Sequence, residues 1–258
     1  MQSNLKNTVK KTALAIFALP ALLLSVRASA DEAHVAVAAN FAEPIKAIAA
    51  VLEKSTGHKL IITLGATGKL YAQILNGAPF DVLLAANTET PAALEKAGLA
   101  QPGSRFTYAT GKLVLWSADA KLVDSKGEVL KHGNFRKLAY AAPKIAPYGA
   151  AAVQVIEKLG LASALAPKLV QGESIGQTFN FVHTGNAELG FVAMSQVLEG
   201  GQLKSGSMWL VPPSLYSPIQ QDAVVLQRAA HNPAALALVK LLKSNSIKDL
   251  IRSCGYDI

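Results

Sequence analysis

Four short stretches of the sequence combine small residues with residues that carry an amide or a hydroxyl group. Each separates an apolar run from a run that favours a helix: AANFAEP (38–44), GATGKL (65–70), APYGAA (146–151) and GESIGQ (172–177). At such a turn the first N–H groups of the helix have no partner inside the helix, and the helix dipole adds a positive end. Both features attract an anion. If the four turns face one cleft, they form a cage of hydrogen-bond donors around an anionic ligand.

The loop TLGATGKL (63–70) does not match a nucleotide-binding P-loop. That motif needs a glycine five places before its Gly-Lys pair and a serine or threonine directly after it. Thr63 and Leu70 stand at those places here. The loop therefore predicts an anion site without a nucleotide and its magnesium ion.

A serine hydrolase is the alternative from another class. GESIG (172–176) fits the G-x-S-x-G pattern, and Asp222 and His231 follow it in the order of a hydrolase triad. No HGGG-like oxyanion segment comes before it, and the simpler interpretation of Ser174 is a helix N-cap. The histidines lie far apart without the spacing of metal ligands. We therefore predict a protein that is not an enzyme and that has no catalytic residue, metal site or cofactor.

The N-terminus has the pattern of a secretory signal peptide. Basic residues precede an uncharged apolar stretch, and Ala28-Ser29-Ala30 offers a cleavage site, so we assign residues 1–30 to the signal. Removing them lowers the formal net charge from +8 to +4. No basic run with interleaved aromatic residues remains, which argues against nucleic-acid binding. Cys254 is the only cysteine, so no internal disulfide can form.

The mature chain alternates between strand and helix patterns. In the first third, strand-like runs at 34–39, 59–64 and 81–86 alternate with helical patterns, and 138–192 repeats this alternation. Alternation of this kind predicts an α/β fold with two lobes, each a mainly parallel sheet flanked by helices. We predict lobe 1 over 31–111 and 221–258, and lobe 2 over 112–220. Two crossing strands, near 112–116 and 223–227, are expected to form the hinge.

Several segments resemble one known family. AANFAEPIKAIA, LGATGKLYAQILNGAPFDVLLAAN, the Pro-Tyr-Gly turn at 147–149, ELGFVAMSQ and the closing RSCGYDI are similar to the periplasmic molybdate-binding proteins of ABC transporters. The resemblance covers essentially the whole mature chain, and its specific part is the GAxGxLxxQI…GAPxD block. It implies a type II periplasmic binding protein, whose two lobes close over the ligand.

The resemblance also implies which residues bind the ligand. Asn40 corresponds to a donor through side chain and amide, Thr67 to a hydroxyl donor, and Tyr148 and Ile175 to backbone donors. Many family members place a ligand-binding tyrosine where this chain has Ala193. We therefore expect the phenol of Tyr148 to reach the ligand in its place.

The resemblance implies a monomer in the periplasm that captures molybdate, and tungstate as well. It would deliver the captured ion to an ABC permease of the inner membrane. The donor types agree with this, because molybdate, tungstate and sulfate are fully ionised near neutral pH and need only donors. Phosphate keeps a proton that needs an acceptor. A sulfate or phosphate receptor of the same fold remains the alternative within the class.

Overall fold

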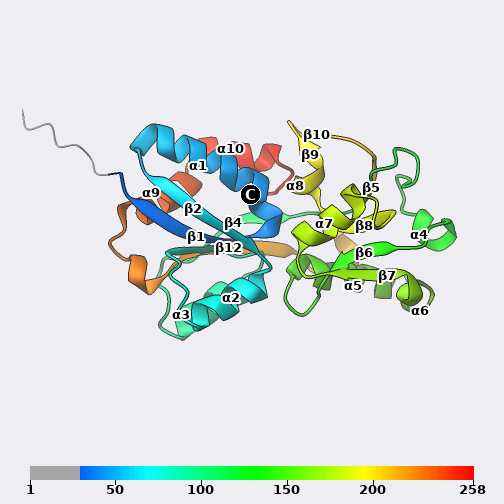
Figure 1. Ribbon diagram of the computed structural model, residues 1–258, viewed down its shortest axis with the longest axis horizontal. Helices are drawn as coiled ribbons and strands as arrows, with labels where there is room; N and C mark the ends of the chain where they lie inside the picture. Colours follow the sequence, from blue (N-terminus) through cyan, green and yellow to red (C-terminus); the bar gives the residue numbers. More distant parts are fainter. Residues whose placement is uncertain (1–29) are drawn as a thin grey trace, which may run out of the picture.

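The computed structural model describes residues 30–258. The predicted signal peptide, apart from Ala30, lies outside these described residues. The chain forms two lobes that lie side by side along the long axis of the molecule (Figure 1). This arrangement confirms the predicted two-lobe α/β fold.

Lobe 1 is built on a five-stranded sheet with the order β2-β1-β3-β12-β4. Its strands are β1 (Glu32–Ala38), β2 (Lys59–Gly65), β3 (Val82–Leu84), β4 (Phe106–Gly111) and β12 (Ile219–Val225). Helices α1 (Ala42–Thr56), α9 (Pro233–Leu242) and α10 (Asn245–Ser253) lie on one side, and α2 (Thr67–Leu75) and α3 (Glu89–Lys96) on the other (Figure 1). Short 3₁₀ turns, η1 (Ala39–Phe41) and η4 (Gln227–Ala229), complete the lobe.

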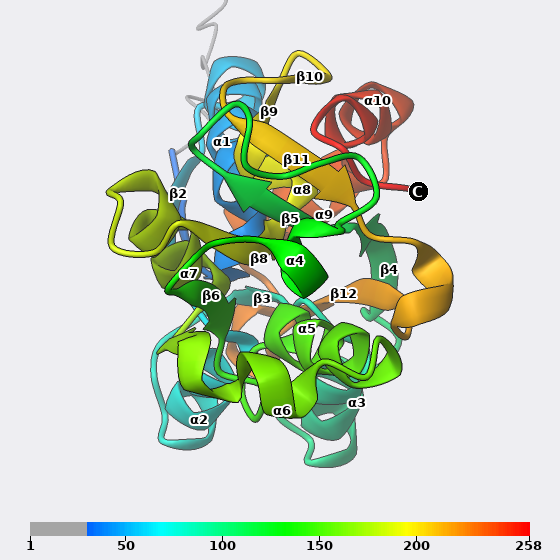
Figure 2. The same ribbon diagram turned by 90° about the vertical axis from the view of Figure 1, so that its right-hand side faces the viewer.

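Lobe 2 contains a second five-stranded sheet with the order β11-β5-β8-β6-β7. Its strands are β5 (Leu113–Ser117), β6 (Leu138–Ala141), β7 (Leu169–Gly172), β8 (Leu189–Ala193) and β11 (Ser207–Leu210). Its helices are α4 (Val129–His132), α5 (Pro147–Lys158), α6 (Ala162–Leu165), α7 (Ile175–His183) and α8 (Met194–Val197), with turns η2 (Ala166–Lys168) and η3 (Pro213–Leu215). A small hairpin consists of β9 (Leu198–Glu199) and β10 (Gln202–Leu203). It lies at the top of the molecule in Figure 2, at the opposite end from α5 and α6.

Both sheets are mixed, whereas the sequence pattern predicts mainly parallel ones. In lobe 1, β1 pairs in parallel with β2 and β3, but β12 pairs antiparallel with β3 and β4. In lobe 2, β6 pairs in parallel with β7 and β8, but β5 pairs antiparallel with β8 and β11. The antiparallel pairings centre on β5 and β12, the first strand of each lobe after the chain crosses into it. Neither strand follows an α-helical crossover, and such a crossover is what a parallel pairing requires.

The apolar face of α1 is buried against the rest of lobe 1. Ile45, Ile48 and Leu52 are all buried, and Gly57 ends the helix with a φ of 78°, a conformation that favours glycine. Each lobe has its own apolar core. Within residues 30–258 no single helix is long and apolar enough to cross a membrane, and the one pair that would suffice together is bent by 118°.

The chain crosses between the lobes at two places. The first crossing is short, because Lys112 alone separates β4 from β5. The second is residues 211–218, between β11 and β12. The prediction of 223–227 is wrong, because these residues lie in lobe 1, in and directly after β12. The C-terminal tail also lies between the lobes (Figure 1), where Asp257 pairs with Thr110 of β4.

Candidate functional site

A small cavity of about 10 Å³ lies between the two lobes. All four residues predicted to bind the ligand line it: Asn40, Thr67, Tyr148 and Ile175. The rest of its lining is alanine, glycine and Pro147, so no ionisable acid or base faces it apart from the tyrosine. Pockets for organic ligands measure about 300–1,000 Å³, so this cavity is too small for an organic molecule.

Lobe 1 contributes side chains to the cavity. Thr67 is the first residue of α2, and its Oγ1 accepts a hydrogen bond from the Ala86 N–H at 3.0 Å. This bond orients the hydroxyl group and leaves its hydrogen free to donate. Asn40 lies in η1, directly after β1, and only 2% of its surface is exposed. Both residues therefore sit where a strand of lobe 1 ends and a helix begins.

Lobe 2 contributes the beginnings of two helices. Tyr148 is the second residue of α5, after Pro147, and Ile175 is the first residue of α7. The N–H groups at these positions have no acceptor within their helices. Ser174 precedes Ile175 with extended backbone, and its Oγ accepts from the Gln177 N–H at 3.2 Å. This bond confirms the N-cap interpretation of Ser174.

The phenol of Tyr148 extends toward the first crossing. Its hydroxyl accepts a hydrogen bond from Gln221 Nε2 at 3.1 Å. Gly111 lies beside it, and a Cβ atom there would come within 2.0 Å of the hydroxyl oxygen. Glycine at the end of β4 thus makes room for this side chain. Burial raises the pKa of Tyr148 well above its ordinary value, so the phenol stays protonated.

Four buried polar residues behind the cavity are absent from the sequence-based prediction: Tyr108, Ser195, Gln221 and Tyr256. Gln221 Oε1 accepts from Asn40 Nδ2 at 2.8 Å and from the Tyr108 hydroxyl at 3.0 Å. The Asn40 carbonyl accepts from Ser195 Oγ and from the Tyr256 hydroxyl, both at 2.8 Å. The network thus joins lobe 1, lobe 2 and the C-terminal tail. The only signals in the sequence were two segments of the family resemblance, ELGFVAMSQ with Ser195 and the closing RSCGYDI with Tyr256.

Comparison with known proteins identifies the family. The family model described as bacterial extracellular solute-binding protein matches residues 33–257. The chain belongs to this family. The solute-binding protein is 57% identical over 243 residues to the molybdate-binding protein ModA of Azotobacter vinelandii, covering 94% of this chain and 96% of that one. It is 50% identical to ModA of Rhodobacter capsulatus, covering 90% and 91%. A solved structure of the periplasmic molybdate-binding protein of A. vinelandii matches with a TM-score of 0.85 at 40% identity, covering 88% of this chain and 99% of its own.

The two lobes of the solute-binding protein are in direct contact beside the cavity. The Gly68 N–H of lobe 1 donates to the Ile145 carbonyl of lobe 2 at 2.9 Å. An ion pair joins Lys69 to Glu173 across the same boundary, and both side chains are at least half exposed. A Cβ atom on Gly68 would lie 2.9 Å from Ile145 Cβ. The lobes are therefore closed against each other, and a glycine permits the contact.

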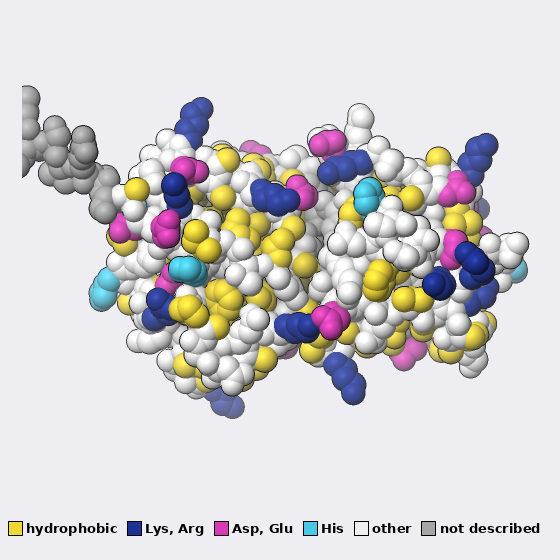
Figure 3. Space-filling model, viewed as in Figure 1, with side chains coloured by type: hydrophobic (Ala, Val, Ile, Leu, Met, Phe, Trp, Pro, Cys, Tyr) yellow, Lys and Arg dark blue, Asp and Glu magenta, His cyan; other side chains and the backbone are white. Residues whose placement is uncertain are grey.

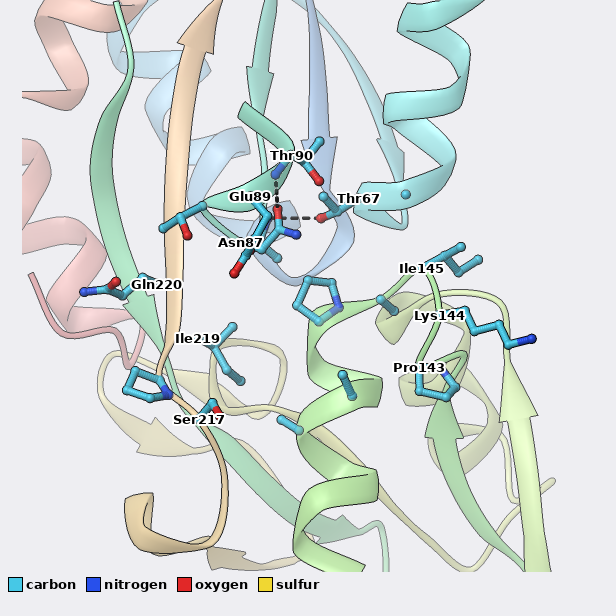
Figure 4. Close-up of a pocket in the computed structure, with 18 of the residues that line it drawn as sticks. Thr67, Asn87, Glu89, Thr90, Pro143, Lys144, Ile145, Ser217, Ile219 and Gln220 are labelled. Carbon is cyan, nitrogen blue, oxygen red and sulfur yellow. Dashed lines mark hydrogen bonds between the residues drawn. The ribbon is translucent and has the colours of Figure 1, made fainter. Parts of the chain in front are cut away.

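A larger cavity of about 350 Å³ adjoins the small one, with which it shares Thr67, Ala86, Ala146 and Pro147. Its other walls come from the start of α3, the loop before α5 and the second crossing. Figure 4 shows Thr67 at its edge, with Asn87 beside it, and the Lys144 side chain pointing away. On the face drawn in Figure 3, basic and acidic side chains are interspersed, so neither charge dominates there.

The residues of the alternative hydrolase triad are not joined. The Asp222 carboxylate accepts hydrogen bonds from Arg105 Nη1 at 2.9 Å and from Thr107 Oγ1 at 2.6 Å. His231 is exposed, and Ser174 caps α7. Within the described part of the chain, no hydrogen bond connects these three residues. The G-x-S-x-G match is thus explained by the helix cap alone.

Proposed function

We propose that this solute-binding protein captures molybdate between its lobes and delivers it to an ABC permease from the periplasm. The observation that carries the proposal is the small uncharged cavity. It lies at the beginnings of helices from both lobes, and neutral donors line it. Asn40, Thr67, Tyr148 and Ile175 are the proposed ligand-binding residues. Tungstate has the same shape and charge, so we propose that it binds as well.

The donor set favours a fully ionised oxyanion. Neither a carboxylate nor a histidine lines the cavity to accept a proton from the ligand. Hydrogen phosphate would bring one hydrogen that needs an acceptor, and an unpaired buried donor is costly. Molybdate brings only acceptors. Each charge-assisted bond contributes about 1.5–3 kcal/mol, so roughly six to eight such bonds allow sub-micromolar affinity even after ordering costs.

The proposed route of delivery rests on the relatives and on the two-lobe fold. The relatives are named molybdate-binding proteins, and a family of extracellular binding proteins fits a secreted monomer that hands its solute to a membrane permease. Hinge motion at Lys112 and at 211–218 would open the cleft for release. The proposal needs neither a cofactor nor a catalytic step.

Thermal melts with four oxyanions test the proposed function. A ligand at a thousandfold excess over its Kd stabilises the folded protein by about 4 kcal/mol. We expect large increases in Tm with molybdate and tungstate and small ones with sulfate and phosphate. Sulfate is the second candidate, since it too is fully ionised and needs only donors. A larger shift with sulfate than with molybdate would support that candidate, and the largest shift with phosphate would contradict the donor argument.

A further inference from the structure

The side chain of Asn40 is buried and only half paired. Its Nδ2 donates to Gln221 Oε1 at 2.8 Å and to the Tyr256 hydroxyl at 3.0 Å, which uses both of its hydrogens. Its Oδ1 is buried and has no hydrogen-bond partner among the described residues. A buried amide oxygen without a partner is unfavourable. In this arrangement Asn40 offers an anion no side-chain donor.

Gln221 links Asn40 to Tyr148. It is fully buried on β12, and its Oε1 accepts from Asn40 while its Nε2 donates to the Tyr148 hydroxyl at 3.1 Å. Because the Tyr148 oxygen accepts here, Gln221 does not use the hydrogen of the Tyr148 hydroxyl. In this first arrangement the phenol is available as a donor and the Asn40 amide is not.

A second arrangement uses the same atomic positions. Half a turn of a side-chain amide exchanges its nitrogen and oxygen. Turning Asn40 alone would place two oxygens 2.8 Å apart with no hydrogen between them, and turning Gln221 alone would oppose two NH₂ groups. Both amides must therefore turn together.

The joint rotation reverses which group is free to donate. Gln221 Nε2 then donates to Asn40 Oδ1 and to the Tyr108 hydroxyl, which in turn donates to the Ala85 carbonyl at 3.0 Å. The Tyr256 hydroxyl donates to Asn40 Oδ1 as well, while Ser195 Oγ still donates to the Asn40 carbonyl. The Tyr148 hydroxyl donates to Gln221 Oε1. Asn40 Nδ2 moves to the position without a protein partner, and it brings two N–H groups to a residue that lines the cavity. An oxyanion would pair them.

We propose that Gln221 is a positioning residue that makes the Asn40 amide and the Tyr148 phenol mutually exclusive donors. A fully ionised oxyanion selects the arrangement in which Asn40 donates to the ligand and the Tyr148 phenol donates to Gln221. The other arrangement presents Asn40 Oδ1, which suits an oxyanion that still carries a proton. This inference rests on the proposed function and makes the amide pair a determinant of its specificity.

Calorimetric titration with molybdate tests the exclusivity. The molybdate affinity of Tyr148→Phe should stay within about fivefold of the parent. The hydroxyl hydrogen that is lost bonds to Gln221 and not to the ligand, and the backbone N–H of residue 148 remains. Asn40→Ala should lose about ten- to a hundredfold, the effect of one charge-assisted bond. A loss of molybdate affinity beyond about fivefold in Tyr148→Phe would overturn the mutual exclusion of the two donors while leaving the proposed function intact. A parent that bound no oxyanion would overturn both.

Gln221→Met tests the positioning role through the ratio of molybdate to phosphate affinity. Substitution of a residue that only supports the fold would leave this ratio unchanged. Methionine fills similar space but cannot orient Asn40. The ratio of molybdate to phosphate affinity should fall by about tenfold, because either face of the Asn40 amide can then meet the ligand. A lower Tm with an unchanged ratio would mean that Gln221 only supports the fold, and would overturn the proposal. Gln220→Met, on the adjacent exposed residue, is the matched control.

Discussion

The two walls of the cavity offer different kinds of donor. Lobe 1 offers side chains, each oriented by another bond: the Ala86 N–H holds the Thr67 hydroxyl, and Gln221 holds the Asn40 amide, which we propose donates to the ligand once both amides have turned. Lobe 2 offers backbone N–H groups at the starts of α5 and α7, which are oriented by the helices themselves. Substitution removes a side-chain donor directly. A backbone donor survives every substitution except proline. Substitutions should therefore weaken ligand binding more readily on the lobe 1 side of the cavity than on the lobe 2 side.

Thr67 gives the largest expected effect on the side-chain wall. Thr67→Val keeps the shape but removes the hydroxyl group, and it also leaves the buried Ala86 N–H without its acceptor. We expect molybdate affinity to fall by about a hundredfold. Thr67→Ser keeps the donor and should stay within about threefold. Calorimetric titration measures both, and equal losses in the two variants would show that the hydroxyl is not a ligand donor.

Ile175 gives the matching test on the backbone wall. Ile175→Pro removes the N–H at the first position of α7, where proline is well tolerated, and Ser174 before it is already extended at φ −145° and ψ 165°. We expect a loss of about ten- to a hundredfold in affinity with little change in the Tm of the ligand-free protein. Ile175→Ala keeps the N–H and should bind nearly as the parent does. A proline variant that bound normally would remove this amide from the site.

Gly68 controls whether the two walls meet. An added Cβ would lie 2.9 Å from Ile145 Cβ and 3.0 Å from its Cα, so closure would be obstructed. Overpacking of this kind costs about 1–3 kcal/mol, so Gly68→Ala should weaken molybdate binding by about tenfold. The Tm of the ligand-free protein should not fall, since alanine favours the helix. Gly176→Ala, whose Cβ would lie 3.3 Å from Ala39 Cβ, should lose less. Unchanged affinity in Gly68→Ala would argue against closure at this contact.

The Lys69–Glu173 ion pair should matter least, although it bridges the lobes. Both side chains are at least half exposed, and exposed pairs contribute about 0.2–1 kcal/mol. Lys69→Gln should therefore change the molybdate Kd by no more than about fivefold, and the difference should vanish at high salt. Glu173→Gln should behave alike. Titrations at two salt concentrations measure this, and a salt-independent loss of a hundredfold in Lys69→Gln would make the lysine a ligand group.

Local patterns predicted the elements well. The turns at Asn40, Thr67, Tyr148 and Ile175 were found from small residues before helices and from the family resemblance, and the structure brings all four to one cavity. Their role in binding stays a prediction, as do the lobe boundaries. The mixed sheets and the second crossing could not be predicted in this way, because strand direction is set by long-range pairing and not by the pattern of one strand.

The network behind the cavity depends on distances in sequence that no local pattern spans. Asn40 is bonded to Gln221, 181 residues away, and to Tyr256, 216 residues away. Each of these residues has an ordinary local setting, a strand interior or a chain end. The expected reach of the Tyr148 phenol was inferred without this network, so its hydrogen bond with Gln221 could not be anticipated.

The central claim is that neutral donors alone hold a fully ionised oxyanion. Titrating the parent with molybdate near neutral pH, in two buffers of different ionisation enthalpy, counts the protons exchanged on binding. We predict no net uptake or release, with a Kd below about 1 μM and much weaker binding of phosphate. Exchange of about one proton per bound ion would contradict the claim, because a titrating group or a protonated ligand would then take part in binding.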